Sequence, residues 1–362
     1  MDQLKNARKT INEVDREMAA LFVKRMEAAK EVALYKKAHA LQITDPAREA
    51  EVIERNSAYI EDETLRTYYV SFLRNNMELS KSLQRRLLDG MRVAYSGVEG
   101  AFANIAALRA FPDAIAVPYP DFRAAYEAVE NCECDCVILP VENSSNGDVG
   151  QVMDLAFFGS LHINGIYDID VIQNLVAAPG AKIEDIKEVI SHPQALGQCS
   201  DYIHRHGFIA TQVVNTAVAA KRVAESGRLD IAAIASEEAA EKYGLQKLES
   251  HINGANVNTT RFAVFSRTAK TETEKDNQFV MLFTVTNEAG SLGRAISIIG
   301  EHGFNLRALK SRPNKELAWS YYFYAEGEGN VNTPEGQAML EDLKGYCNSV
   351  RVIGSFEKEM SL

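Results

Sequence analysis

Residues 190–203, ISHPQALGQCSDYI, place hydrogen-bonding side chains at the start of a predicted helix. Pro193 suits the first helical turn, and Ser191 is the predicted cap, with Gln194 three residues later as in a capping box. Ser191, Gln194 and Gln198 would share one face of this helix. The segment contains no Lys or Arg. It therefore predicts a site that holds an anion with helix-end amides and neutral side chains.

The same segment contains Ser191, His192 and Cys199, which are the residue types of a nucleophile and its base. Catalytic triads are assembled in space from separate segments, so a Ser beside a His in the sequence is a weak indication of one. A hydrolase that uses Cys199 and His192 is kept as a minor alternative. An ordinary capped helix in an α/β domain is the structural alternative.

A second group of candidate residues lies on an amphipathic segment, residues 4–40, that contains no Pro or Gly. Its apolar residues repeat with helical spacing, and Arg8, Arg25 and Lys36 fall on or beside that apolar stripe. Cations in a packed seam are costly unless an anion meets them, so they predict an anionic ligand. By helical rise, Arg25 and Lys36 are about 16 Å apart, whereas Arg8 is about 26 Å from Arg25. We therefore expect Arg8 to act from a second chain, in an intertwined antiparallel dimer.

Two further helices are predicted in the N-terminal segment. One starts at Asp45-Pro46 and carries Arg48 and Glu49, and the other spans residues 62–88. The residues that carry chemistry in this segment are Arg8, Arg25, Lys36, Asp45, Arg48, Glu49, Ser80 and Gln84. In type and spacing, this set closely resembles the all-helical chorismate mutase family.

The resemblance implies that residues 1–89 form an all-α, three-helix domain that rearranges chorismate to prephenate, with all eight residues binding chorismate. Arginines would hold the two carboxylates of the substrate in its reactive conformer. Lys36 and Gln84 would be catalytic, because they would stabilise the negative charge that develops on the breaking ether oxygen. No acid–base step and no metal is implied. A charged helical dimerisation module is the structural alternative.

Short apolar runs alternate with amphipathic helices in the next part of the chain, which predicts an α/β domain at residues 90–268 with two lobes and a cleft. The predicted helices are 102–110, 121–130, 149–158, 193–205, 216–226 and 236–242. The predicted strands are 92–95, 115–117, 136–139, 165–171, 174–178, 188–190, 209–214, 231–234 and 261–265.

Two features of this part could suggest other functions. Residues 97–100, GVEG, lack the third glycine of a dinucleotide fingerprint and the Gly-Lys of a phosphate loop, which argues against nucleotide binding. Cys132, Cys134 and Cys136 could suggest a metal, but no second Cys/His pair lies nearby in the sequence, so a strand lead-in is favoured. No metal and no cofactor is expected.

Four neutral polar loops follow or precede predicted strands, at residues 142–147, 191–198, 215–217 and 258–262. Ligands of open α/β sheets bind at such strand ends. The motifs PVENSSNG, SHPQALGQCS, NTA and TRF in these loops closely resemble those of prephenate dehydratases, in the same order. Asn215, where Ser is commoner, and the start GVEGAFAN, which lacks a usual Ser, are small departures.

The resemblance implies a periplasmic-binding-protein-like fold and the loss of water and CO2 from prephenate to give phenylpyruvate. Thr260 would be the catalytic proton donor, polarised by its neighbours because a Thr hydroxyl is a weak acid. Helix starts at Ser191 and Thr216, with Arg261, would hold carboxylates, and Glu142 would be structural. The residues expected to bind prephenate are Asn143, Ser144, Ser191, His192, Gln194, Gln198, Thr216 and Arg261.

The remaining sequence reads as a charged linker at residues 269–277 and a βαββαβ segment at residues 278–362, an order typical of ferredoxin-like α+β domains. The predicted strands are 279–286, 304–311, 318–325 and 350–356, and the helices are 291–301 and 333–345. Residues 287–293 and 310–313 resemble the effector motifs of ACT domains, in which phenylalanine usually binds at a dimer interface. Ser291, Gly293 and Lys310 depart from those motifs, which puts effector affinity in doubt. The expected effector contacts are Gly290, Ser291, Leu292, Asn305, Ser311, Arg312 and Pro313.

Composition limits the remaining alternatives. The chain has 362 residues and a net charge of −11, and residues 1–89 carry 16 basic and 15 acidic side chains. The sequence has no clustered basic face and no long apolar run, so we expect it to bind neither nucleic acid nor membrane. Its odd number of cysteines indicates reduced thiols, which favours a cytoplasmic protein. The sequence favours a bifunctional homodimeric or larger enzyme of phenylalanine synthesis under phenylalanine feedback. A non-enzymatic amino-acid sensor is the main alternative.

Overall fold

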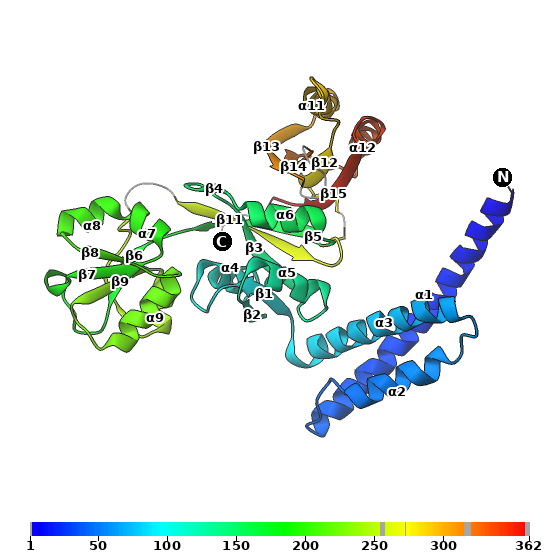
Figure 1. Cartoon of the computed structure of the whole chain (residues 1–362), viewed down its shortest axis with the longest axis horizontal. Coiled ribbons are helices and arrows are strands. Elements are labelled where there is room, and N and C mark those ends of the chain that lie inside the picture. Colours follow the sequence, from blue (N-terminus) through cyan, green and yellow to red (C-terminus); the bar gives the residue numbers. More distant parts are fainter. Residues whose placement is uncertain (1, 254–257, 272, 315–319, 359–362) are drawn as a thin grey trace. The chain divides into compact units, whose positions relative to one another are not determined.

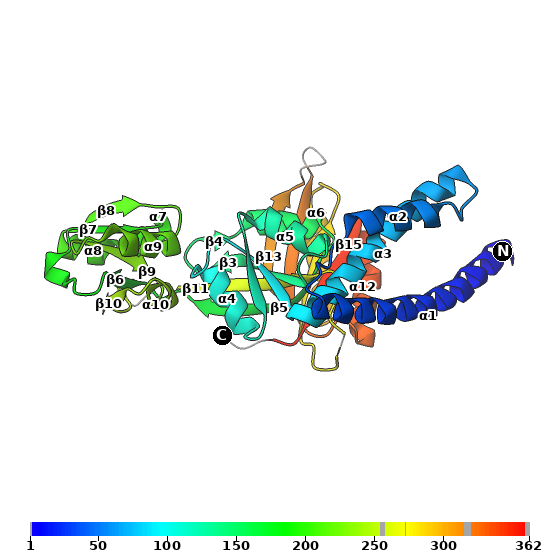
Figure 2. The same cartoon turned by 90° about the horizontal axis from the view of Figure 1, so that it is seen from below.

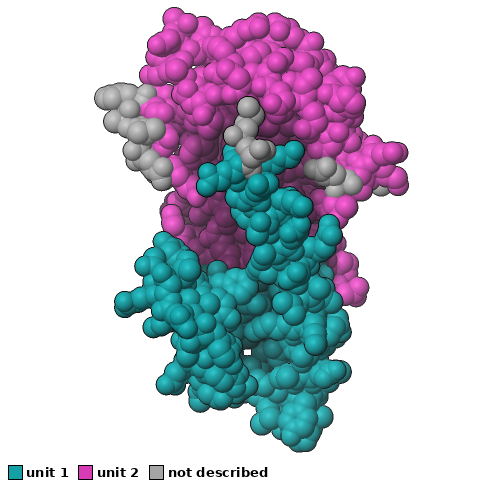
Figure 3. All heavy atoms as spheres, turned by 90° about the vertical axis from the view of Figure 1, so that its right-hand side faces the viewer, with its two compact units in different colours: residues 1–92, 131–135 teal, residues 93–130, 136–362 magenta. Residues whose placement is uncertain are grey.

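The computed structural model describes residues 2–253, 258–271, 273–314 and 320–358 (Figure 1). The chain divides into two compact units, which Figure 3 colours separately. Unit 1 consists of Met1–Arg92 with Asn131–Asp135, and unit 2 consists of Val93–Glu130 with Cys136–Leu362. Among the described residues, no helix is long and apolar enough to cross a membrane.

In unit 1, residues 2–90 form the helices α1 (Asp2–Ala38), α2 (Pro46–Ser57) and α3 (Glu63–Asp89). Asp45 caps α2 by accepting a hydrogen bond from Arg48 N at 3.1 Å, and Asp62 caps α3 in the same way. Gly90 ends α3 at φ +94°, a conformation that favours glycine. The predicted all-helical N-terminal domain is confirmed.

The first lobe of unit 2 is a mixed sheet with the strand order β2-β1-β3-β11-β5, and β4 pairs with β3. Strands β1 and β3 are parallel, and β11 runs antiparallel to both β3 and β5. The strands are β1 (Arg92–Ser96), β2 (Ile115–Tyr119), β3 (Cys136–Asn143), β4 (Gly147–Asp148), β5 (His162–Asp170) and β11 (Thr259–Ser266). The helices are α4 (Phe102–Ala110), α5 (Phe122–Glu130) and α6 (Gly150–Phe158).

The chain leaves this sheet after β5, builds the second lobe, and returns through β11 (Figure 1). The second lobe has the strand order β10-β6-β9-β7-β8, formed by β6 (Asn174–Ala177), β7 (Glu188–Ser191), β8 (Ile209–Gln212), β9 (Ile231–Ala235) and β10 (Gln246–Glu249). Its helices, which Figure 2 shows around the sheet, are α7 (Pro193–Gln198), α8 (Ser200–His206), α9 (Thr216–Ser226) and α10 (Glu237–Lys242).

Alternate residues of the second-lobe strands pack on opposite faces, as strand geometry requires. Leu175 and Ala232 pack with apolar residues of α7 and α8, whereas Val176 and Ala233 pack with those of α9 and α10. The predicted two-lobed α/β architecture is confirmed. Three details were not predicted: the short strands β4 and β10, the 3-10 helix Ile183–Asp185, and a break at Cys199 that divides the expected helix 193–205 into α7 and α8. Gly197, a poor helix former, lies just before that break.

The C-terminal residues of unit 2 form a sheet with the strand order β13-β14-β12-β15. The elements are β12 (Gln278–Thr284), α11 (Ser291–Glu301), β13 (Asn305–Pro313), β14 (Tyr321–Glu328), α12 (Pro334–Tyr346) and β15 (Ser349–Phe356), in the predicted βαββαβ order. Residues 318 and 319 of the expected strand 318–325 lie outside the described residues.

The central strands of this C-terminal sheet, β12 and β14, are buried on both faces. One face, with Phe279, Met281 and Phe283, packs on apolar residues of α11 and α12. Tyr322 and Tyr324 alternate with the residues of that face and are also almost fully buried. Their face meets the first lobe, because the ring of Tyr322 stacks on Phe157 of α6 with centroids 4.0 Å apart. The sheet is therefore enclosed between its own helices and the first lobe.

Candidate active sites

The three helices of unit 1 enclose a cavity of about 270 Å³. Seven of the eight residues predicted to bind chorismate line it: Arg25, Lys36, Asp45, Arg48, Glu49, Ser80 and Gln84. Apolar side chains, including Val32, Val52 and Met77, complete the lining. Arg8 is not part of this lining; it lies 17 residues before Arg25 on the continuous helix α1, about 26 Å away by helical rise. The cavity thus combines cations, carboxylates and an apolar wall.

Local contacts hold the cationic side chains of this cavity in place. The Arg25 guanidinium donates to Asn76 Oδ1 at 3.0 Å and to the Ser80 hydroxyl, and burial lowers the pKa of Arg25. Lys36 Nζ donates to the carbonyl oxygen of Ile43 at 2.6 Å. Gln84 is buried, and its Oε1 has no hydrogen-bond partner among the described residues. A buried amide without a partner indicates a position that a ligand completes.

Lys81 also lines the cavity and was not predicted from the sequence. It is 8% exposed, and its Nζ lies 3.2 and 3.3 Å from the two carboxylate oxygens of Glu49 and 2.6 Å from Glu78 Oε1. Burial alone would lower the pKa of Lys81, but hydrogen bonds to Glu78 and Glu49 outweigh it and raise that pKa. The sequence did contain a signal for this position: Lys81 lies one helical turn after Met77 and on the same face as Ser80 and Gln84.

We expect Lys81→Met to lower the kcat/KM of chorismate rearrangement about 30-fold, because Glu49 would lose its partner beside a dianionic substrate. Lys81→Arg should recover most of this loss. The measurement is the initial rate of chorismate consumption, with the helical circular dichroism signal as the control for folding and prephenate dehydration as the control for the amount of active protein. Wild-type rearrangement in Lys81→Met would contradict the expectation.

In unit 2, the first lobe brings Asn143 and Thr260 together across neighbouring strands. Asn143 ends β3 and pairs in register with Thr260 at the start of β11. Asn143 Nδ2 donates to Thr260 Oγ1 at 2.9 Å and to Asn258 Oδ1 at 2.8 Å. Because Thr260 Oγ1 accepts this bond, its own hydrogen is left to donate elsewhere. Ser144 supports the pair from the next position, since its Oγ accepts from Thr259 N at 3.0 Å.

Two glutamines of the second lobe join this cluster. Asn258 Nδ2 donates to Gln198 Oε1 at 2.9 Å, and Gln194 Nε2 lies 3.5 Å from Asn143 Oδ1. Gln198 Nε2 is buried and has no hydrogen-bond partner among the described residues. We call Asn143, Gln194, Gln198, Asn258 and Thr260 the amide–hydroxyl cluster. The donors of this cluster come from both lobes, and Gln198 Nε2 is left for a ligand.

The structure places Ser191 differently from the prediction. Ser191 is fully buried and donates to the carbonyl oxygen of Ile234 at 2.6 Å, so its hydroxyl serves the second-lobe sheet. The cap of α7 is His192, whose Nδ1 accepts from Gln194 N at 3.3 Å, and burial lowers the pKa of His192. We therefore correct the predicted capping role and prephenate contact of Ser191, because its hydroxyl is buried and bonded to the neighbouring strand β9.

Thr216 is the first residue of α9 and is buried, while Asn215 caps this helix by accepting from Val218 N at 2.7 Å. Arg261 requires a second correction. It follows Thr260 on β11, so its side chain lies on the opposite face, where it pairs with Glu142, Asp168 and Glu326. A guanidinium engaged by three carboxylates is not available to a substrate carboxylate.

The predicted effector residues do not converge within one chain. Gly290, with φ +88°, precedes α11, and Ser291 Oγ lies 3.0 Å from Thr286 Oγ1. Asn305 starts β13, whereas the segment with Ser311 and Pro313 ends it, about 20 Å further along the strand. Arg312 is corrected: its guanidinium binds the Asp154 carboxylate of α6 at 2.8 and 3.2 Å. Leu292 packs partly into the core.

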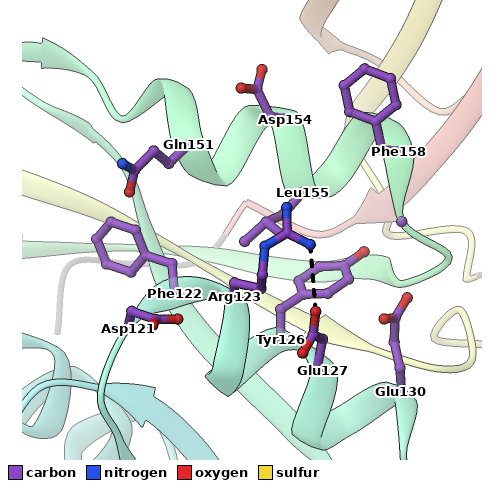
Figure 4. A pocket seen from close by; sticks show the side chains of 11 residues that line it. Asp121, Phe122, Arg123, Tyr126, Glu127, Glu130, Gln151, Asp154, Leu155 and Phe158 are labelled. Atoms are coloured by element: carbon purple, nitrogen blue, oxygen red, sulfur yellow. Dashed lines mark hydrogen bonds and ion pairs between the residues drawn. The ribbon is translucent and has the colours of Figure 1, made fainter. Parts of the chain in front are cut away.

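A larger hollow of about 750 Å³ lies between α5 and α6 (Figure 4). Figure 4 shows Arg123 and Glu127 on its wall, joined by a 3.4 Å ion pair between exposed side chains. Asp154 also lines it, but this carboxylate is engaged by Arg312 and Tyr322. None of the predicted site residues lines this hollow, and we assign it no catalytic role.

Comparisons with known proteins identify both regions. The family model described as chorismate mutase type II matches residues 7–85, and the one described as prephenate dehydratase matches residues 93–270. The chain is 30% identical to the bifunctional chorismate mutase/prephenate dehydratase of Aquifex aeolicus over 367 residues, which cover 99% of both chains. It is 32% identical over 319 residues to arogenate dehydratase/prephenate dehydratase 1 of Arabidopsis thaliana, covering 82% of this chain and 81% of that protein.

Solved structures resemble about three quarters of the chain. The prephenate dehydratase of Arthrobacter aurescens in complex with L-Phe is 25% identical with a TM-score of 0.69, covering 74% of this chain and 90% of that chain. The structure of GqqA, described as a novel type of quorum quenching acylase, is 28% identical with a TM-score of 0.69, covering 74% and 98%. The match to the Aquifex protein extends over nearly the whole of both chains and includes both family regions. The chain therefore belongs to the family of bifunctional chorismate mutase/prephenate dehydratases.

Proposed function

We propose that the chain catalyses two consecutive reactions: rearrangement of chorismate to prephenate in unit 1, and dehydration with decarboxylation of prephenate to phenylpyruvate in unit 2. The observation that carries this proposal is that, of the three buried side-chain atoms without a hydrogen-bond partner among the described residues, two lie in the predicted sites, the acceptor Gln84 Oε1 and the donor Gln198 Nε2, and the third is Gln173 Oε1. Gln84 and Gln198 both lie among the residues that the substrate chemistry requires.

In the mutase cavity, Arg25 and Arg48 hold the two carboxylates and fold chorismate into its reactive conformer. Lys36 Nζ and the Nε2–H group of Gln84 donate to the ether oxygen and stabilise its charge as the C–O bond breaks and the C–C bond forms, while Gln84 Oε1 is left to accept from a donor of the substrate. Asp45, Glu49 and Ser80 contact the remainder of the substrate. The reaction moves no proton, so preorganised charge is sufficient for catalysis.

Arg8 of a second copy completes the site in this proposal. Leu4, Ile11, Val14 and Leu21 on α1 are 48–65% exposed, which is unusual for an apolar helix stripe. A long helix needs a partner to bury such a stripe, and an antiparallel copy brings its Arg8 toward Arg25. The proposed assembly is therefore an intertwined homodimer, or a larger assembly built from it.

This assembly predicts complementation between inactive variants. Arg8→Met and Arg25→Met should each abolish rearrangement, yet mixed and reassembled chains should recover about a quarter of the wild-type rate, because heterodimers retain one intact site. The rate of chorismate consumption after joint refolding measures this, and each variant refolded alone is the control. Absence of recovery in verified heterodimers would refute the shared site.

In unit 2, the amide–hydroxyl cluster receives prephenate. The ring hydroxyl leaves as the carboxylate is lost as CO2, and aromatisation drives the reaction. Thr260 gives its proton to the departing hydroxide to form water and is reprotonated by solvent, while its bond from Asn143 Nδ2 at 2.9 Å stabilises the oxygen that loses the proton. Gln198 Nε2, Gln194, Ser144 and His192 orient the substrate, and the start of α9 at Thr216 faces a carboxylate.

The C-terminal βαββαβ segment acts as an ACT domain that binds phenylalanine in this proposal. Its topology and the L-Phe complex of the Arthrobacter relative support the assignment. Because Asn305 and Ser311 lie at opposite ends of β13, two chains must contribute to one site. We propose domain limits of 1–89, 90–268 and 278–362, with residues 269–277 as the linker.

Hydrolysis by a nucleophile in the 190–203 segment is disfavoured. Burial raises the pKa of Cys199 to about 12, so its thiol is neutral at ordinary pH, and the Ser191 hydroxyl is engaged by Ile234. The experiment that tests the proposed function is a coupled assay in which chorismate is supplied and phenylpyruvate is measured, with prephenate supplied separately. Added phenylalanine should slow the second step. Failure to convert either substrate would overturn the assignment.

A further inference from the structure

Arg261 forms the centre of an ion cluster on the side of β11 opposite Thr260. Its guanidinium lies 3.1 Å from Glu142 Oε2, 2.7 Å from Glu326 Oε2 and 3.6 Å from Asp168 Oδ1. Glu326 belongs to β14 of the C-terminal segment and is 6% exposed. Tyr324 donates to its other oxygen at 2.9 Å. The two shorter contacts, with Glu142 and Glu326, are charge-assisted and hold the backbone of β11 at the residue next to Thr260.

Lys310 ties the same cluster to the turn that follows β3. Its Nζ lies 2.8 Å from Glu142 Oε1 and 2.6 Å from Asp148 Oδ1. Glu142 and Asp148 are paired residues on β3 and β4, which flank the turn beginning with Asn143. Lys310 therefore forms ion pairs with the residues on both sides of this turn. A carboxylate at position 310 would face Glu142 and Asp148, which gives the departure of Lys310 from the effector motif a physical reason.

Further contacts fix the C-terminal sheet on the first lobe. Arg312 binds Asp154 with two hydrogen bonds, and Tyr322 donates to the same carboxylate at 2.7 Å. Arg351 donates to the carbonyl oxygens of Phe157 and Gly159 at 2.9 Å, where α6 ends and its dipole favours a cation. Because α6, β3 and β11 are all held by this sheet, Lys310 and Glu326 have a fixed position relative to the amide–hydroxyl cluster.

We propose that Arg261 is a positioning residue for dehydration. It holds Thr260 through the backbone of β11, and it holds Asn143 through Glu142. Lys310 and Glu326 of the C-terminal segment keep Arg261 and Glu142 in place. The inference rests on the proposed dehydration at Thr260. It assigns the C-terminal segment a part in building the active site, in addition to its proposed effector role. A shift of the C-terminal sheet would then loosen the 2.9 Å bond between Asn143 and Thr260.

The test separates positioning from substrate binding by kinetics. Arg261→Met should lower kcat for prephenate dehydration about 100-fold with KM within about threefold of wild type, because the substrate contacts remain while the proton donor is misplaced. Glu326→Gln and Lys310→Met should each lower kcat about tenfold in the same way. Adding Glu326→Gln to Arg261→Met should cause little further loss, since both act through one contact.

Two controls accompany these variants. Chorismate rearrangement in unit 1 should stay at the wild-type rate, and a wild-type thermal unfolding transition of unit 2 reports that its fold is intact. Lys344→Met removes an exposed ion pair with Glu341 on α12 and serves as the matched control for Lys310→Met, with no expected change in either activity. If Arg261→Met does not fold, Arg261→Lys, which keeps the charge but not the three-way contact, should show an intermediate kcat.

The outcomes are distinct. A rise in KM without a change in kcat would make Arg261 a substrate contact and overturn the proposal, as would wild-type kinetics in Arg261→Met or Arg261→Lys. Unchanged kcat in both Glu326→Gln and Lys310→Met would remove the role of the C-terminal segment. Absence of prephenate dehydration in the wild-type chain would instead overturn the proposed function.

Discussion

Replacing Thr260 by valine is expected to lower prephenate dehydration about 1,000-fold while chorismate rearrangement continues at the wild-type rate. Valine keeps the volume and β-branching of threonine but removes the hydroxyl that donates the proton. Thr260 is 9% exposed, and its Oγ1 accepts from Asn143 Nδ2 at 2.9 Å, so the loss is local to the amide–hydroxyl cluster. Steady-state rates of phenylpyruvate formation from prephenate measure the effect.

Thr260→Ser provides the matched control, because it restores the hydroxyl with looser orientation and should retain much of the activity. Asn143→Ala is expected to act in the same direction as Thr260→Val, since the oxygen that loses its proton would no longer be stabilised. Dehydration within a few fold of wild type in Thr260→Val would remove Thr260 from the mechanism.

Replacing Lys36 by methionine is expected to lower the kcat of chorismate rearrangement about 100- to 1,000-fold, because one of the two donors to the developing ether charge is lost. Lys36 lines the cavity and its Nζ donates to the Ile43 carbonyl at 2.6 Å, so the ammonium is held in place before substrate arrives. Methionine fills a similar volume, which limits the disturbance to charge. The measurement is chorismate consumption at saturating substrate.

Lys37→Met is the matched control, since Lys37 is the adjacent, exposed lysine and does not line the cavity. Both variants should dehydrate prephenate at the wild-type rate. Chorismate rearrangement in Lys36→Met within a few fold of wild type would exclude Lys36 from catalysis.

Most of the helices and strands could be predicted from short-range patterns in the sequence. Helical spacing of apolar residues, the Asp45 and Asp62 caps and the absence of Pro or Gly from residues 4–40 predict the three helices because these are short-range effects. The same holds for the alternating runs of the α/β part. The divided helix at Cys199 and the two-residue strand β4 were missed, since a single backbone distortion or bridge leaves little trace in a periodic pattern.

The sequence also determined which residue types are available for chemistry. Cations on an apolar stripe indicated an anion site in unit 1. Seven of the eight residues predicted to bind chorismate line one cavity. Neutral amides and hydroxyls in four loops indicated the second site, and the structure joins Asn143, Gln194, Gln198 and Thr260. Residue type and spacing along one helix or one loop are properties of the chain itself.

Only the tertiary structure decided which partner each side chain meets. Alternation along β11 puts Arg261 on the face opposite Thr260, but its partners Glu142 and Glu326 follow only from how β3 and β14 pack against β11. In the same way, the bond of Ser191 to Ile234 follows only from the pairing of β7 with β9. Lys81 and Glu49 meet across two helices, and Arg312 meets Asp154 across 158 positions of the chain. Such contacts depend on how elements pack, because the charges and hydrogen bonds involved act over a few ångströms in space and are indifferent to separation along the sequence.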